Sequence, residues 1–131
     1  MSARVTEASQ ADMLADIVRD PCTIRLYAND PGDSPSSADF QELDGGGYAP
    51  KPMRSAGWDM SLAPSLASYG KQAWEFTGPA GVVRGYYVTR NSDGRLRWFD
   101  PLPGGPMNIA NDGDQIAVSV ELSLSGSREQ I

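Results

Sequence analysis

The chain contains no histidine. The side chains considered for chemistry are therefore its carboxylates, arginines, tryptophans and single thiol. Without histidine, Ser–His and Cys–His nucleophiles and histidine-ligated metal sites are excluded. A glycosidase needs two positioned carboxylates, and Trp58-Asp59 and Trp74-Glu75 could supply them beside aromatic platforms. Both tryptophans lie on the apolar phase of an alternating pattern, so we interpret them as core residues. A carbohydrate-binding module or small glycosidase is the alternative.

Three further features invite a site and have a simpler explanation. Asn111-Asp-Gly-Asp114 crowds the oxygen ligands that calcium prefers, but no bidentate glutamate follows and a β-turn accounts for it. Gly45-Gly46-Gly47 precedes neither Lys-Ser/Thr nor a helix start, unlike a phosphate-binding loop. Cys22 is the only cysteine, which excludes an intrachain disulfide, and we interpret it as a small core residue. The sequence therefore predicts no catalytic residue, no metal site and no cofactor.

Length and charge bound the function. The 131 residues fit one domain, and 40% of them are hydrophobic, enough for a core. A net charge of -6 argues against general nucleic-acid binding, which needs clustered Lys and Arg. No apolar run approaches the roughly 20 residues of a membrane span, and the first ten residues lack a signal-peptide core. We expect a soluble protein, made in the cytoplasm, that binds neither nucleic acid nor membrane.

One helix is predicted, over Gln10 to Arg19. Ser9 and Asp12 resemble a capping box at its start, and Asp20-Pro21 ends it because proline disfavours helix in the preceding residue. Its apolar residues fall on one stripe: Met13, Leu14, Ile17 and Val18. So short a helix must dock on its own domain or on a neighbouring subunit.

After Pro21 the apolar period changes to two, which predicts strands. We expect them at 22–28, 40–43, 48–53, 58–63, 73–77, 82–90, 95–100 and 116–124, with 48–53 at a sheet edge because of Pro50 and Pro52. The fold class is all-β, an antiparallel β-sandwich or jelly-roll-like fold with one short N-terminal helix. Residues 1–22 form an arm and helix, 23–125 the β-sandwich domain, and 126–131 a polar C-terminal tail.

A hairpin is expected through Asn91-Ser92-Asp93-Gly94, where glycine supplies a positive φ. Four arginines cluster around it: Arg84, Arg90, Arg95 and Arg97. Across an antiparallel pair they could line one sheet face, with Tyr86 and Phe99 as neighbours. This face is either solvated or a contact surface for an acidic partner, since arginine and tyrosine are favoured at interfaces.

The order of motifs resembles small virion structural proteins of tailed bacteriophages, over roughly Thr23 to Leu124. The matching pieces are Arg25-Leu26-Tyr27 before an Asp/Pro-rich loop, Gly47-Tyr48-Ala49, Gly85-Tyr86-Tyr87-Val88-Thr89, Phe99-Asp100-Pro101-Leu102 and Gly113-Asp114. The proline- and glycine-rich segment 101–106 departs from that pattern.

The resemblance implies a non-enzymatic virion component with no cofactor. The first expectation is a capsid decoration (cement) protein on the outer capsid surface, made in the host bacterial cytoplasm. Its partners would be the major capsid protein and itself, as a dimer or trimer. The alternative is a minor tail, baseplate or fibre component that contacts a host receptor. We expect the helix, the 48–53 edge and the tail to touch neighbours, and the partner-binding residues to be Met13, Leu14, Ile17, Tyr48, Arg84, Tyr86, Arg95 and Arg97.

Overall fold

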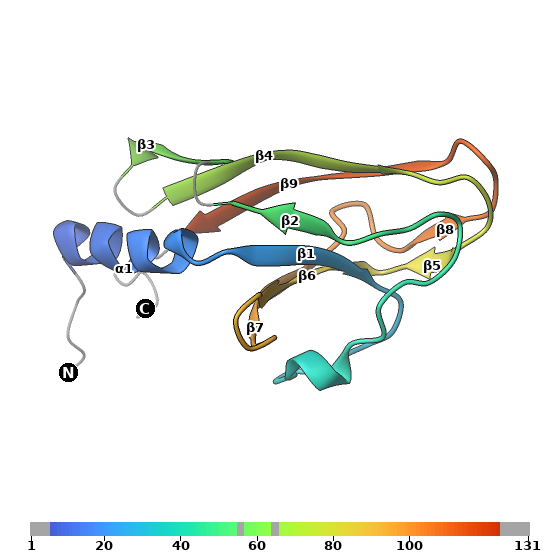
Figure 1. Ribbon diagram of the computed structural model, residues 1–131, viewed down its shortest axis with the longest axis horizontal. Helices are drawn as coiled ribbons and strands as arrows, with labels where there is room; N and C mark the ends of the chain where they lie inside the picture. Colours follow the sequence, from blue (N-terminus) through green and yellow to red (C-terminus); the bar gives the residue numbers. More distant parts are fainter. Residues whose placement is uncertain (1–5, 55–56, 64–65, 124–131) are drawn as a thin grey trace. The chain divides into compact units, whose positions relative to one another are not determined.

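The computed structural model of the chain describes residues 6–54, 57–63 and 66–123. One α-helix, one short 3-10 helix (Ser37–Asp39) and nine strands make up this part: α1 (Glu7–Arg19), β1 (Cys22–Tyr27), β2 (Lys51–Met53), β3 (Trp58–Ala63), β4 (Leu66–Glu75), β5 (Gly81–Val83), β6 (Gly85–Arg90), β7 (Leu96–Pro101), β8 (Met107–Ile109) and β9 (Gln115–Ser123). They form three antiparallel sheets, in the orders β2-β1-β6-β7, β3-β4-β9 and β5-β8 (Figure 1). The all-β class with one short helix is confirmed.

The chain divides into two compact units. The first, called the helix unit, contains α1, β3, the start of β4 up to Lys71 and the end of β9 from Ser119. The second, called the sheet unit, contains Pro21–Met53 and Gln72–Val118. The four-stranded sheet and the β5-β8 sheet therefore belong wholly to the sheet unit.

Helix α1 begins earlier than the sequence predicted. Thr6 is the N-cap, and its hydroxyl oxygen accepts a hydrogen bond of 3.1 Å from the backbone N–H of Ser9. The predicted start at Gln10 with Ser9 as N-cap was therefore wrong. Ser9 is already helical, and its backbone N–H is bound by the Thr6 hydroxyl. The predicted end is confirmed, since Asp20 before Pro21 has extended backbone (φ -75, ψ 133).

The predicted apolar stripe of α1 is only partly buried. Leu14 and Val18 lie one turn apart in the core of the helix unit against Ala67 of β4. Met13 is 48% exposed and Ile17 is half-buried. The helix thus docks on its own chain through Leu14 and Val18, and the core is completed by two partly buried side chains, Trp58 and Leu122.

Adjacent helix positions should therefore differ sharply in their contribution to stability. We expect Leu14→Ala to lower the free energy of unfolding by about 3 kcal/mol, because it removes a fully buried side chain from the core of the helix unit and leaves a cavity. Met13→Ala should change it by less than about 0.5 kcal/mol, since that side chain faces solvent. Urea unfolding followed by circular dichroism measures both. Equal losses for the two variants would show that α1 is docked differently.

Strand β1 lies inside the four-stranded sheet, between β2 and β6. Its residues Cys22, Ile24 and Leu26 are buried, and Ile24 lies opposite Val88, which is also fully buried. The predicted alternation of β1 and the role of Cys22 as a small core residue are confirmed. Strand β2 contains Pro52 and lies at the sheet edge, which confirms the predicted edge, but it covers only 51–53 of the predicted strand 48–53.

A cluster of aromatic rings lies on the opposite face of this sheet. Phe40 stacks on Tyr87 with 4.4 Å between ring centroids and meets Tyr27 edge-on at 5.0 Å. The predicted strand 40–43 is wrong: only an isolated bridge joins Tyr27 to Glu42. The edge of β1 is shared, because β2 pairs with its first residues and the segment around Glu42 with its end.

The predicted strand 82–90 is also wrong, because it consists of two strands in different sheets. Strand β5 pairs with β8, whereas β6 pairs with β1 and β7. The break falls at Arg84, whose N–H donates to the Tyr27 carbonyl (2.8 Å) and whose carbonyl accepts from the Leu102 N–H (3.0 Å). The chain changes sheets here because both backbone groups of Arg84 are bound outside β5.

The alternations around the last strands are confirmed. In β9, Ile116, Val118 and Val120 are buried while the residues between them are exposed. Trp74 and Phe76 are likewise buried, at 4% and 1% exposure, but the strand β4 runs over Leu66–Glu75 and not over the predicted 73–77. The predicted hairpin is present, with Gly94 at φ 73. Residue 124 and the predicted tail at 126–131 lie outside the described residues.

Candidate partner-binding surface

The tryptophans do not form a carbohydrate platform in the sheet unit. The Trp74 indole N–H donates to the Ala49 carbonyl (2.8 Å), and the Lys51 ammonium lies 5.6 Å from the ring centroid. Because Trp74 is buried and makes these two contacts, its ring has no open face on which a sugar could stack. In the helix unit, Trp58 is half-buried and packs edge-on against Tyr69, with 5.2 Å between centroids.

The eight predicted partner-binding residues divide by burial. Leu14 and Tyr86 are buried, at 0% and 5% exposure, so their side chains are not available for direct contact with a partner. The other six reach the surface, and their role stays a prediction: Met13 and Ile17 in the helix unit, Tyr48, Arg84, Arg95 and Arg97 in the sheet unit.

The predicted arginine-lined face with both Tyr86 and Phe99 as neighbours is wrong. Tyr86 lies opposite Asp100, and Phe99 lies opposite Tyr87, the next residue of β6. Because successive strand residues point to opposite faces, Tyr86 and Phe99 lie on different sides of the sheet. Phe99 instead joins the aromatic cluster, with 5.3 Å between its ring centroid and that of Phe40.

One of the hairpin arginines is engaged within the turn itself. Arg90 forms an ion pair of 2.6 Å with Asp93, whose carboxylate also accepts from the Arg95 N–H (3.0 Å). Hydrogen bonds from the Arg90 side chain and then from the Arg95 backbone hold the pKa of Asp93 well below its usual range. Arg95 and Arg84 have exposed side chains and remain available to an acidic partner.

A polar network ties the 28–49 segment to the four-stranded sheet. The Arg25 guanidinium donates to both carboxylate oxygens of Glu42 (3.0 and 3.2 Å) and to the Thr89 hydroxyl (3.0 Å). The Tyr48 hydroxyl donates to Glu42 (2.6 Å) and accepts from the Leu26 N–H (3.1 Å). Burial, and then the hydrogen bond to Glu42, raise the pKa of Tyr48. Tyr48 therefore links this segment to β1.

The buried Tyr87 makes the stability of the fold sensitive to alkaline pH. Burial, and then the charge of Glu42, raise the pKa of Tyr87 to about 12 from an ordinary value of 10.0. A raised pKa in the folded state contributes stability that is complete below pH 10 and is lost as pH rises through about 12. The urea midpoint should fall over this interval, and Tyr87→Phe should make the fall shallower. A midpoint with no pH dependence there would contradict the contribution of buried phenols.

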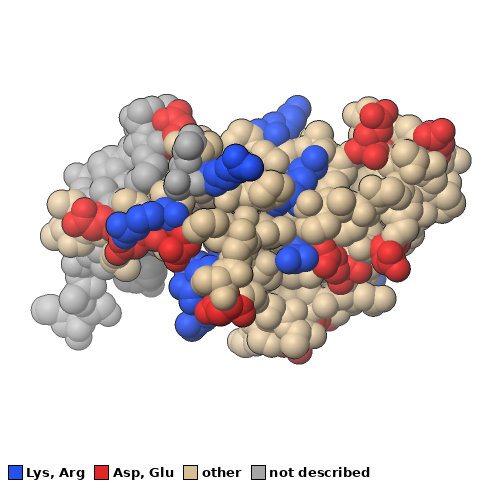
Figure 2. Space-filling view, in the orientation of Figure 1, with Lys and Arg blue, Asp and Glu red and all other residues tan. Residues whose placement is uncertain are grey.

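The apolar surface of the sheet unit centres on the β5-β8 ribbon, which sequence reasoning missed. Val82 and Met107 are 42% and 44% exposed, whereas Val83 and Ile109 are buried. In the register Val83 lies opposite Met107 and Val82 opposite Asn108, so the two exposed side chains lie on opposite faces of the ribbon. On the face drawn in Figure 2, basic groups lie in the middle and left of the view, and the charged groups at the right-hand end are all acidic.

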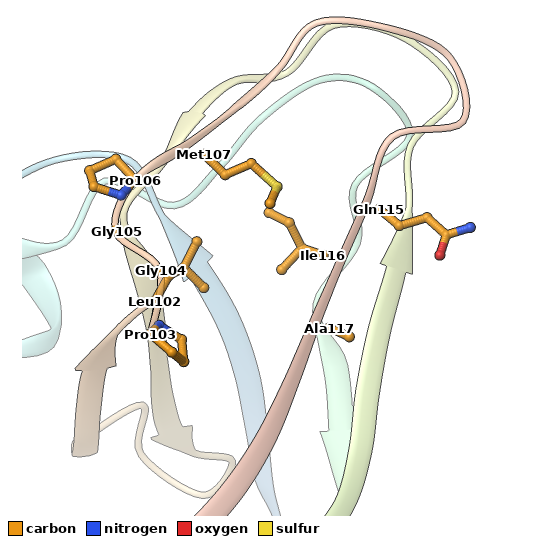
Figure 3. A pocket seen from close by; sticks show the side chains of 9 residues that line it. All are labelled: Leu102, Pro103, Gly104, Gly105, Pro106, Met107, Gln115, Ile116 and Ala117. Atoms are coloured by element: carbon orange, nitrogen blue, oxygen red, sulfur yellow. The ribbon is translucent and has the colours of Figure 1, made fainter.

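A hollow of about 370 Å³ adjoins the ribbon, between the 102–107 segment and the start of β9. Figure 3 shows Leu102, Met107 and Ile116 directed toward this space, whereas Gln115 and Ala117 point away from it. Leu102 and Ile116 are buried and form its floor, while Met107 stands exposed at its rim. This arrangement can receive an apolar side chain of a partner.

The calcium-like turn at 111–114 is closed by its own carboxylate. Asp114 accepts from the backbone N–H groups of Ala110 and Asn111, each at 3.0 Å. Among the described residues, no group of three or more His, Cys, Asp or Glu side chains could hold a metal ion. In the same part of the chain, no helix has the length and apolar character that crossing a membrane requires.

Comparisons with known proteins gave no relative. No protein-family model, no curated protein and no solved structure matches the chain.

Proposed function

We propose that the chain is a non-enzymatic structural protein of a tailed-bacteriophage virion, a capsid decoration (cement) protein of the outer head. In this proposal it stabilises contacts between subunits of the major capsid protein, and its fold is an antiparallel β-sandwich of the jelly-roll kind. The observation that carries the proposal is the presence of exposed apolar side chains on each compact unit: Met13 on the helix unit, Val82 and Met107 on the sheet unit.

A protein that braces a joint must hold at least two neighbours. Each unit has its own core and its own exposed apolar side chain, which supports one contact on each unit. Single exposed apolar residues make weak contacts, but many copies on one shell make weak contacts sufficient. The exposed Arg84 and Arg95 would add complementarity to an acidic capsid surface.

The location can be tested by counting copies in separated virion parts. Heads assembled without tails, and tails isolated without heads, are purified from the phage that carries this gene. Quantitative mass spectrometry then compares the chain with the major capsid protein and with a tail-tube protein. The proposal expects the chain on tail-less heads, in a fixed ratio to the capsid protein. Recovery in isolated tails alone would support the tail, baseplate or fibre alternative instead.

A further inference from the structure

Strand β9 is the longest strand at the edge of a sheet. It runs from Gln115 to Ser123, nine residues, and pairs with β4 on one side. On its other side, no strand of the described part of the chain pairs with it. An edge of this length presents a row of backbone donors and acceptors, a template for another strand.

The other edges of the two larger sheets carry features that discourage pairing. Strand β2 has three residues and contains Lys51 and Pro52. Strand β7 has a register shift against β6 and ends in Pro101, and β3 has a register shift after Asp59. Strand β9 contains neither proline nor a basic residue, and its one charged side chain is Glu121. Natural edge strands use such features to prevent association with other strands. Strand β9 has no proline and no basic residue, so its edge is less protected than the others.

We propose that the β9 edge pairs with β9 of a second copy of this chain, in antiparallel orientation across a twofold axis. Antiparallel pairing of two identical strands satisfies the symmetry of a closed dimer, which leaves no further β9 edge for growth. The sheet β3-β4-β9 would continue into the same three strands of the second copy. Such a dimer would form in solution, without attachment to a capsid.

The register follows from full overlap of the strands. The midpoint of Gln115–Ser123 is Ser119, so Ser119 faces Ser119 of the second copy. Val118 then faces Val120 of the second copy, which keeps buried positions on one face. The exposed Glu121 faces Ala117 of the second copy, and therefore no like charges are opposed.

Charge at position 119 tests the pairing. Ser119 is exposed, so Ser119→Glu and Ser119→Lys should both fold, but each places like charges opposite one another at the axis. We expect the native chain and the Ser119→Thr control to have twice the mass of one chain by sedimentation equilibrium. Each charged variant alone should be a monomer, and an equimolar mixture of the two should recover a heterodimer. A monomeric native chain, or charged variants that remain dimers, would overturn the proposal.

Cysteine cross-linking tests the register. Cys22, the native thiol, is buried, so the unmodified chain should give no cross-linked dimer under mild oxidation. Ser119→Cys should give a disulfide-linked dimer, because the two thiols meet at the axis. Glu121→Cys should not, since its counterpart lies four residues further along the paired strand. Cross-linking at 121 rather than at 119 would reject this register.

Discussion

Replacement of Gly85 by alanine should lower the free energy of unfolding by about 3 kcal/mol, because a Cβ at this position has no room. It would lie 2.6 Å from the Tyr27 hydroxyl oxygen and 2.8 Å from the Pro101 Cα, and still closer to the Asp100 carbonyl oxygen. Two of these neighbours are backbone atoms of β7, which cannot move without breaking the β6-β7 pairing. The substitution therefore strains the four-stranded sheet where the chain leaves β5.

Gly78 provides the matched control in the same unit. A Cβ at Gly78 would meet nothing within 4 Å, and its φ lies outside the left-handed region. Gly78→Ala should therefore change the free energy of unfolding by less than about 1 kcal/mol. Urea unfolding followed by tyrosine and tryptophan fluorescence compares the two. If Gly85→Ala proves as stable as Gly78→Ala, the close approach of Tyr27 and β7 to Gly85 is incorrect.

The second large effect concerns attachment rather than stability. Val82→Glu combined with Met107→Glu places a charge on each face of the β5-β8 ribbon and should weaken binding to heads by roughly a hundredfold, because whichever face contacts the head would then have to desolvate a charge. Both side chains are over 40% exposed, so the fold should tolerate the change. Binding is measured by co-sedimentation of purified protein with heads that lack the chain.

The control for that experiment carries the same added charge elsewhere in the sheet unit. Ser92 and Ala73 are exposed, and Ser92→Glu combined with Ala73→Glu also adds two negative charges. This variant should bind heads within about threefold of the native chain, an effect expected of surface charge remote from the contact. Equal loss in both double variants would indicate that net charge, and not the β5-β8 ribbon, governs attachment.

Local sequence pattern predicted the elements whose form depends on their own residues. The alternation in β9, the helix ended by Asp20-Pro21 and the hairpin at Gly94 are of this kind. The strand predictions were wrong where contacts with residues distant in sequence determine the structure. The apolar run from Val82 gives no sign that the backbone of Arg84 forms hydrogen bonds with Tyr27 and Leu102. The chain passes from one sheet to another at this residue. The segment at Phe40 alternates like a strand but turns inward to stack on Tyr87.

The candidate surface was harder to predict than the fold, because exposure is a tertiary property. Leu14 and Met13 are neighbours of similar polarity, yet only Met13 faces solvent. Tyr86 has a side chain typical of interfaces but is buried, whereas the exposed Met107 follows the proline- and glycine-rich segment 101–106 and was not among the predicted partner-binding residues. A useful signal was present there, since a methionine among prolines and glycines has few neighbours in sequence to cover it.

The most direct test of a role in bracing the head is the temperature at which packaged DNA escapes. Heads are prepared without the chain, and the purified native protein is added back to saturation. Dye-accessible DNA is then followed on heating, with the Val82→Glu/Met107→Glu double variant as control. The account predicts that native protein raises the release temperature and that the double variant does not. An unchanged release temperature with native protein bound would contradict it.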